Sequence, residues 1–189
     1  MPISKWEERY RAGEGLDKPS EPLLVSLVEQ LKPGRALDLA CGAGRNALHL
    51  ARAGWRVTAV DSSRAAMSLP ERSAQELGLQ VDTRVADLES GEFELEQSGF
   101  DLICNFLYLQ RNLFPQIRAA VKPGGHVIAI VAMFDDDPDV RPMNPEFLLN
   151  PGELAGFFDG WEIIHSREGK PLGGTGRRMA ELIARLPRA

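Results

Sequence analysis

The sequence predicts an α/β fold on a mostly parallel sheet whose last strand runs antiparallel, and three observations predict it. Short apolar runs alternate with segments of helical periodicity along most of the 189 residues. A loop of small residues, 40–44, directly follows the first apolar run. Near the C-terminus, two strand-like runs follow each other without a helix between them. These two runs must pair as a hairpin, so the last strand is antiparallel to its neighbours.

The first half of the chain predicts four helices and three strands. Trp6 and Tyr10 share a face of a short helix at residues 4–12. Ser20 is the expected N-cap of a helix that reaches about Leu31. A helix that Gly54 closes follows the small-residue loop, and another follows Ser62 and Ser63, with Pro70 expected to kink or split it before Gly78. The strands of this half are expected at residues 36–39, 55–60 and 79–86.

The second half predicts the remaining strands and two helices. A helix is expected at residues 108–121 with Pro115 in its first turn, and another at 151–158. The nearly continuous apolar run at 126–132 suits a strand that is buried on both faces of a parallel sheet. A Gly-rich turn at 169–176 should join the last two strands. The strands of this half are expected at residues 100–105, 126–132, 161–167 and 179–186.

Size and composition limit the possible functions. The length favours one domain over residues 1–189 with one core. A formal net charge of -5 argues against a broad electrostatic grip on nucleic acid and favours a small-molecule partner. The two cysteines, Cys41 and Cys104, show no metal-ligand spacing, so we expect no metal site and free thiols in a reducing cytoplasm. A polar N-terminus and the lack of long apolar runs predict a cytoplasmic protein without a membrane segment.

The small-residue loop has the character of a nucleotide-binding turn. Gly42 and Gly44 allow a ligand to approach the main-chain N–H groups at the start of the next helix. Asp61 ends the second strand about 20 residues further on, where ribose hydroxyls of either NAD or S-adenosylmethionine would lie. Asp38 decides between them, because its carboxylate would repel a pyrophosphate but would attract the ammonium of a methionine moiety. The loop therefore favours S-adenosylmethionine.

A longer series of motifs resembles the class I S-adenosylmethionine-dependent methyltransferases. The series comprises Asp38, Ala40, Gly42 and Gly44 in the first loop, then Asp61, residues 86–88, residues 100–103 and the Lys-Pro-Gly-Gly at 122–125. The details are most similar to the small tellurite-resistance-type and thiopurine-type methyltransferases. The resemblance implies a Rossmann-like three-layer sandwich with a seven-stranded, mostly parallel sheet of order 3-2-1-4-5-7-6, and an N-terminal lid-like segment at residues 1–18.

Carboxyl ends of parallel strands bind ligands in such folds, so residues there are the candidate cofactor site. Asp38 is assigned to the methionine amino group, with a capping carboxylate as the alternative. Asp61 is assigned to both ribose hydroxyls. Asp87 is assigned to the adenine amino group, with a turn cap as its alternative. The expected cofactor-binding residues are Tyr10, Asp38, Ala40, Gly42, Gly44, Asn46, Asp61, Ser62, Asp87, Leu88 and Asn105.

The acceptor is expected under the long loop at residues 133–150, which follows the fifth strand. Tyr108, Arg111 and Arg141 are the candidate catalytic residues, the arginines as cations that steer an anionic acceptor. Since the pocket candidates include no evident base, we expect an oxyanion or thiolate such as a tellurite-, selenite- or thiopurine-like molecule, with S-adenosylhomocysteine as product. The alternatives are a non-catalytic or NAD-type nucleotide-binding module and an RNA or protein methyltransferase.

Overall fold

A computed structural model describes residues 3–13, 18–170 and 176–188 of the chain. The chain divides into two compact units, Met1–Glu94 and Leu95–Ala189, which we describe in turn. Parts of two predicted segments lie outside the described residues: 1–2 and 14–17 of the lid-like segment, and 171–175 of the Gly-rich turn. The expectation of one domain over residues 1–189 stays a prediction.

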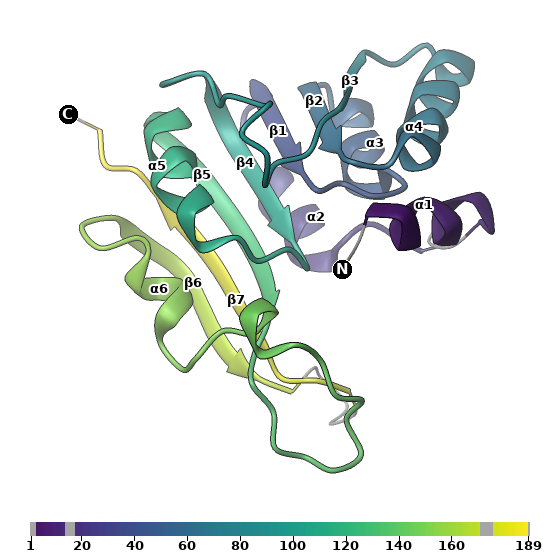
Figure 1. Cartoon of the computed structure of the whole chain (residues 1–189). Helices are drawn as coiled ribbons and strands as arrows, with labels where there is room; N and C mark the ends of the chain where they lie inside the picture. The colour runs from purple at the N-terminus through teal and green to yellow at the C-terminus, as the bar shows by residue number, and fades with distance from the viewer. Residues whose placement is uncertain (1–2, 14–17, 171–175, 189) are drawn as a thin grey trace. The chain divides into compact units, whose positions relative to one another are not determined.

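The first unit places three parallel strands beside its helices. Neighbouring strands β1 and β2 pair in parallel, as do β2 and β3. All of β1 after its first residue and most of β2 are buried, whereas β3 is largely exposed. Helix α3 packs against β2, and α4 packs against β3 (Figure 1). The elements are α1 (Ile3–Arg11), α2 (Pro22–Val28), β1 (Arg35–Leu39), α3 (Arg45–Arg52), β2 (Arg56–Asp61), α4 (Arg64–Leu77) and β3 (Val81–Val85).

Two expectations for the helices of this unit are wrong. Glu21, not Ser20, occupies the N-cap of α2, and the Ser20 hydroxyl instead donates to the carbonyl of Arg45 at 3.0 Å. Pro70 does not split α4, which continues to its left-handed C-cap Gly78, and a kink at Pro70 stays a prediction. The pyrrolidine ring of Pro70 packs on the backbone of Gly44, so a tertiary contact accompanies the lost helical hydrogen bond.

The second unit contains four strands. β4 and β5 pair in parallel, whereas β7 is antiparallel to both β5 and β6. Residues 126–132 of β5 alternate little and are nearly all buried, as expected for an inner strand. The elements are β4 (Phe100–Phe106), η1 (Arg111–Leu113), α5 (Phe114–Ala120), β5 (Val121–Ala132), η2 (Pro145–Phe147), α6 (Glu153–Gly156), β6 (Glu162–Gly169) and β7 (Met179–Arg185).

The helices of the second unit are shorter than the sequence predicts. The segment predicted as one helix at 108–121 is a 3-10 turn, η1, followed by α5, with Pro115 in the first turn as expected. Only four residues of the predicted helix at 151–158 are helical. Both segments pack through aromatic rings: Phe114 stacks on Phe157 at 4.1 Å between ring centroids, and it meets the edge of Phe158. Such packing depends on side-chain burial rather than on helical length.

The strand order confirms the predicted fold class. The strands follow the order β3-β2-β1-β4-β5-β7-β6 in a seven-stranded sheet, with the last strand antiparallel. Among residues 3–13, 18–170 and 176–188, no helix is both long and apolar enough to cross a bilayer.

Candidate functional site

Asp38 lies in the penultimate position of β1 and is buried, with 1% of its surface exposed. Within the described residues, its Oδ2 atom has no hydrogen-bond partner, while the carboxylate accepts a hydrogen bond from the N–H of Ala47. Burial raises the pKa of Asp38 to about 7 in spite of that bond and of the nearby Arg45. A buried carboxylate oxygen without a donor is the arrangement that an ammonium group would complete.

Asp61 ends β2 and is held in place by the backbone of two loops. Its Oδ2 accepts from the N–H of Gly42 at 2.8 Å, and its Oδ1 accepts from the N–H of Ser63 at 2.9 Å. The N–H of Ser62 also contributes, yet burial raises the pKa of Asp61. The charges of Asp61 and Asp38 interact, and each raises the pKa of the Cys41 thiol, which burial raises further. The first two strand ends therefore bring their carboxylates close together, and Cys41 is a neutral thiol there.

The loop between these carboxylates requires glycine. Gly42 and Gly44 have positive φ angles of 55° and 75°, and Ala40 also has a positive φ, 50°, which is uncommon for a side-chain-bearing residue. A Cβ on Gly44 would lie 2.4 Å from the Cβ of Pro70, and one on Gly42 would lie 2.4 Å from the hydroxyl of Tyr10. Gly44 thus permits α3 and α4 to pack, and Gly42 permits α1 to lie over the loop.

Helix α1 is joined to the start of α4 by Glu7. The Glu7 Oε2 accepts from the Ser63 hydroxyl at 2.7 Å and from the N–H of Ala65 at 3.1 Å. Ser63 at the same time caps α4 by accepting from Ala66, and its own N–H donates to Asp61. These hydrogen bonds lower the pKa of Glu7 and keep it ionised. Sequence reasoning missed Glu7, because more than fifty residues separate it from its partners and no local pattern connects them.

Three further predicted cofactor residues lie in the first unit, and two of them have an identified structural role. The Oδ1 of Asn46 accepts from the N–H of Glu21 at 2.9 Å, so Asn46 ties the start of α2 to α3. The Oδ1 of Asp87 accepts from the N–H of Glu89 at 2.9 Å, which is the turn-cap arrangement. Leu88 is buried beside it. The cofactor roles of Asn46, Asp87 and Leu88 stay predictions.

In the second unit, Asn105 lies in β4 near the carboxyl end of the strand. It is 1% exposed, its Nδ2 donates to the carbonyl of Tyr108 at 3.1 Å, and its Oδ1 has no partner among the described residues. The Tyr108 hydroxyl donates to Gln110 at 2.8 Å. Between them Leu107 has a positive φ of 60° and an exposed apolar side chain, a strained combination that clusters at functional sites.

The two arginines predicted to steer the acceptor have different surroundings. Arg111 is paired with Glu153 through Nε and Nη2, and it also donates to the carbonyls of Glu146 and Leu148 at 2.9 Å. Arg111, which lies in η1, therefore contacts both the loop at 133–150 and the start of α6. Arg141 is exposed within the loop, and its carbonyl accepts a hydrogen bond from Arg177. Arg177 was not predicted, since a cation in a Gly-rich sequence carries no signal of its own.

A comparison with protein families identifies the family of the chain. Residues 17–174 match the family described as tellurite resistance protein TehB. The chain belongs to this family. Among curated relatives of this TehB-family chain, a probable S-adenosyl-L-methionine-dependent methyltransferase TehB from Haemophilus influenzae is 27% identical over 152 residues, which cover 77% of this chain and 52% of the relative. The chain spans about half the length of the curated TehB relatives that it matches.

Other relatives carry different acceptor names. A ubiquinone biosynthesis O-methyltransferase from Nitrosococcus oceani is 32% identical over 139 residues, covering 66% of this chain and 58% of the relative. Among solved structures, TehB from Haemophilus influenzae has a TM-score of 0.77 at 22% identity, with 95% of this chain and 67% of that chain covered. This likeness confirms the fold.

A second solved structure of similar fold contains bound ligands. The 1,6-didemethyltoxoflavin-N1-methyltransferase from Burkholderia thailandensis, with bound 1,6-didemethyltoxoflavin and S-adenosylhomocysteine, has a TM-score of 0.71 at 19% identity. The match covers 98% of this chain and 87% of that chain. At 19% identity this comparison supports the fold of the chain and nothing more specific.

Proposed function

We propose that the chain is an S-adenosylmethionine-dependent methyltransferase that acts on a small molecule. The buried, unpartnered Oδ2 of Asp38 beside Asp61 carries the proposal. Asp38 would receive the methionine ammonium, and Asp61, already oriented by three backbone N–H groups, would accept from the ribose hydroxyls. Tyr10, Ala40, Gly42, Gly44 and Ser62 line the same loops, and the family's named methyltransferases support the assignment.

The bound cofactor would supply an activated methyl group. As the acceptor's lone pair forms the new bond to carbon, the methyl–sulfur bond breaks and its electron pair stays on sulfur, leaving S-adenosylhomocysteine. The protein then has to orient the acceptor and exclude water, which can contribute on the order of 7 to 11 kcal/mol to lowering the barrier. Tyr108, just past the end of β4, is the proposed group that orients the acceptor, and Asn105 near the end of β4 is a proposed cofactor residue.

We infer an acceptor that arrives as an anion or a soft nucleophile, such as a tellurite-, selenite- or thiopurine-like molecule. No histidine or glutamate among the predicted acceptor residues is placed to remove a proton, so a pre-ionised nucleophile fits best. Cys41 and Cys104 are not joined in a disulfide, which supports a reducing cytoplasm, and the net charge of -5 supports a partner other than nucleic acid.

Isothermal calorimetry tests the cofactor assignment. We expect S-adenosylmethionine and S-adenosylhomocysteine to bind with one site per chain and NADH not to bind. Asp61→Asn should weaken both adenosyl ligands by at least about tenfold, because a charge-assisted hydrogen bond is worth about 1.5–3 kcal/mol. Asp159→Asn, an exposed carboxylate on the second unit, is the matched control. Tight NADH binding would overturn the proposal in favour of the NAD-type alternative.

A further inference from the structure

Asp38 and Asp61 are the buried carboxylates among the described residues of the first unit, with 1% and 8% of their surfaces exposed. They lie on neighbouring parallel strands, where Asp38 is paired with Ala59, two residues before Asp61. Burial and, less strongly, the charge of Asp61 raise the pKa of Asp38. Where two carboxylates share a site of low polarity, one of them takes up a proton more readily than the other.

Hydrogen bonding identifies the carboxylate that takes up the proton. Asp61 accepts from three backbone N–H groups of the adjoining loops, and both of its oxygens are engaged. Asp38 accepts from the N–H of Ala47, and its Oδ2 has no partner among the described residues. Burial raises the pKa of both groups, and that of Asp38 reaches about 7. Because N–H donors favour the ionised form, Asp61 keeps its charge and the proton goes to Asp38.

The charged groups around Asp38 supply little compensation. Arg45, at the start of α3, lowers the pKa of Asp38 through its charge, but it also forms an ion pair with Glu21 at 3.6 Å. Cys41, in the loop after β1, is a neutral thiol, and Glu7 on α1 adds a negative charge that acts on the neighbouring carboxylate. Within the described residues no cation contacts Asp38, so the ammonium of a ligand would be the first to do so.

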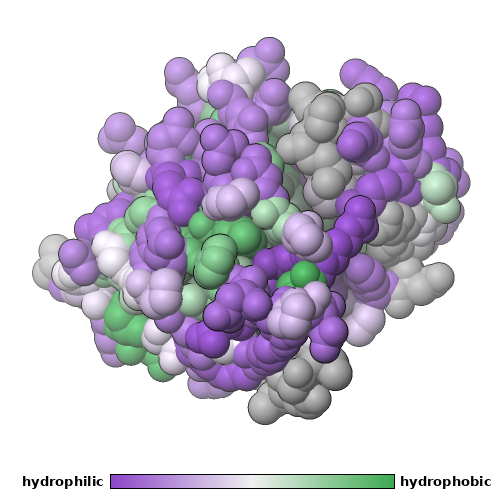
Figure 2. Space-filling view, turned by 60° about the horizontal axis from the view of Figure 1, so that its bottom comes forward, coloured by the Kyte–Doolittle hydropathy of each residue, from purple (hydrophilic) through white to green (hydrophobic). Residues whose placement is uncertain are grey.

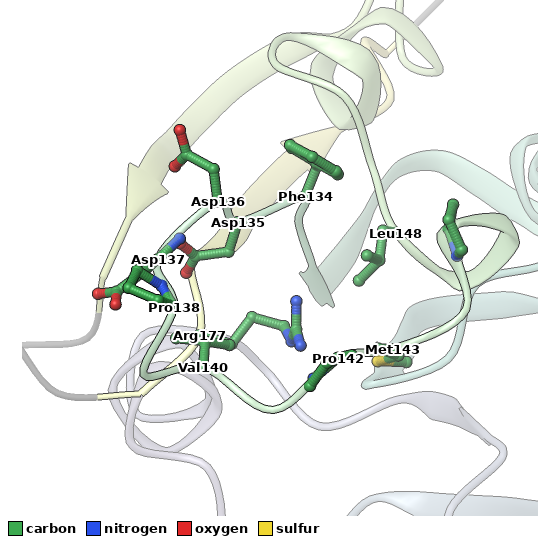
Figure 3. Close-up of a pocket in the computed structure, with 11 residues that line it drawn as sticks. Phe134, Asp135, Asp136, Asp137, Pro138, Val140, Pro142, Met143, Leu148 and Arg177 are labelled. Carbon is green, nitrogen blue, oxygen red and sulfur yellow. The ribbon is translucent and has the colours of Figure 1, made fainter.

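Asp38 differs in this respect from carboxylates at the surface. Hydrophilic side chains, in purple, predominate on the face drawn in Figure 2, where water stabilises their charges. Asp135 and Asp137 line a hollow of about 270 Å³ in the second unit, drawn in Figure 3. The N–H of Arg178 lowers the pKa of Asp135, and Lys170 lowers that of Asp137. Both are therefore ionised at neutral pH, whereas Asp38 lacks such donors.

We propose that ligand binding exchanges a proton for an ammonium group: Asp38 holds a proton in the free protein and releases it to the solvent when an adenosyl amino acid binds. The proposal rests on the methyltransferase function proposed above and adds a proton to its binding equilibrium. The proton leaves Oδ2, and the same oxygen then accepts from the ammonium. Since binding releases a proton, the affinity rises with pH below about 7 and becomes constant above it.

Isothermal calorimetry of the full chain in two buffers of different ionisation enthalpy counts the released protons. The ligands are S-adenosylhomocysteine and 5′-methylthioadenosine, which keeps the adenine, the ribose and the sulfur but has no amino-acid part. At pH 6 we expect S-adenosylhomocysteine to release about 0.9 proton per site and methylthioadenosine to release none. The affinity for S-adenosylhomocysteine should rise about fivefold from pH 6 to pH 7, and less than about twofold from pH 7 to pH 8.

Two variants separate Asp38 from other titrating groups. Asp38→Asn cannot ionise, so it should bind S-adenosylhomocysteine more weakly and without proton release, while its unchanged affinity for methylthioadenosine shows that the fold is intact. Asp159→Asn, which replaces an exposed carboxylate of the second unit, should keep the wild-type proton release. If Asp38→Asn binds too weakly to measure, the two ligands on the wild type still decide.

The outcomes distinguish this proposal from the cofactor assignment. Equal proton release by the two ligands on the wild type would overturn the proposal, as would binding of S-adenosylhomocysteine at pH 6 without proton release. Either result would leave the cofactor assignment in place. Failure of S-adenosylhomocysteine to bind at every pH would overturn the cofactor assignment and this proposal with it.

Discussion

Gly44 and Gly78 both have positive φ angles, but only one of them is crowded. A Cβ on Gly44 would lie 2.4 Å from Pro70, whereas nothing lies within 4 Å of a Cβ on Gly78. Gly78→Ala should therefore cost about 1 kcal/mol of unfolding free energy from the backbone alone. Gly44→Ala should cost about 3 kcal/mol, because overpacking adds to the same strain. Urea denaturation of the two variants measures the difference, and equal losses would show that Pro70 does not confine the loop.

Asp38 makes the stability of the ligand-free protein depend on pH. Its pKa is raised to about 7 from 3.8, so the folded state holds a proton that the unfolded state releases. Stability is therefore highest below pH 4 as far as this group is concerned, and it falls as the pH rises through the range from 4 to 7. The full effect is about 4 kcal/mol, taking roughly 1.4 kcal/mol for each tenfold change in proton affinity.

Chemical denaturation of the wild type and Asp38→Asn between pH 5 and pH 8 tests this effect. We expect the wild type to lose stability over this range and the variant, which cannot ionise, to lose less. Asp159→Asn replaces an exposed carboxylate and should retain the wild-type slope. If Asp38→Asn and the wild type show the same slope, Asp38 has an ordinary pKa. The proposal that its buried carboxylate receives the ammonium of a ligand would then have to be abandoned.

At the scale of elements, α1 is attached to the start of α4 by one side chain. Glu7 accepts from Ser63 and Ala65, and Ser63 in turn donates to Asp61. Glu7→Ala should therefore release α1 and raise the dissociation rate of S-adenosylhomocysteine several-fold, while Glu7→Gln, which keeps an acceptor oxygen, should recover part of the loss. Stopped-flow fluorescence of Trp6, which stacks with Tyr10 in α1, can report the release.

Glu8 offers a matched control for that experiment. It is the next residue of the same helix and is exposed, and the hydrogen bonds that Ser63 and Ala65 donate to α1 go to Glu7 instead. Glu8→Ala should leave the dissociation rate unchanged. A rate equally raised by both substitutions would mean that helix α1 is destabilised in general and that the Glu7 contact has no special role.

For the whole molecule, cofactor binding should appear as added stability. A ligand at 100 times its dissociation constant stabilises the folded state by about 2.7 kcal/mol. For a chain of 189 residues this corresponds to a rise of about 5–10 °C in the thermal midpoint. We expect S-adenosylhomocysteine to produce this rise, and NADH and single-stranded RNA to produce none. A midpoint raised by RNA and lost with added salt would favour the RNA methyltransferase alternative.

Periodicity and turn residues in the sequence were enough to predict the alternating elements, the parallel strands, the antiparallel last strand and the small-residue loop between Asp38 and Asp61. These features depend on local spacing: an apolar run, a glycine with positive φ or a helix cap acts over a few residues. The resemblance carried by the same residues predicted the strand order and the family, which the topology and the comparison confirm.

Only the tertiary structure revealed the roles that depend on contacts between distant residues. Pro70 lies inside a helix and packs against Gly44, Glu7 caps a helix more than fifty residues away, and Arg111 is engaged with Glu153 and two carbonyls. A side chain has no fixed partner until the fold brings one within hydrogen-bonding distance, so local sequence patterns cannot show whether an arginine is free for a ligand or already paired. Burial is settled in the same way, and burial is what raises the pKa of Asp38.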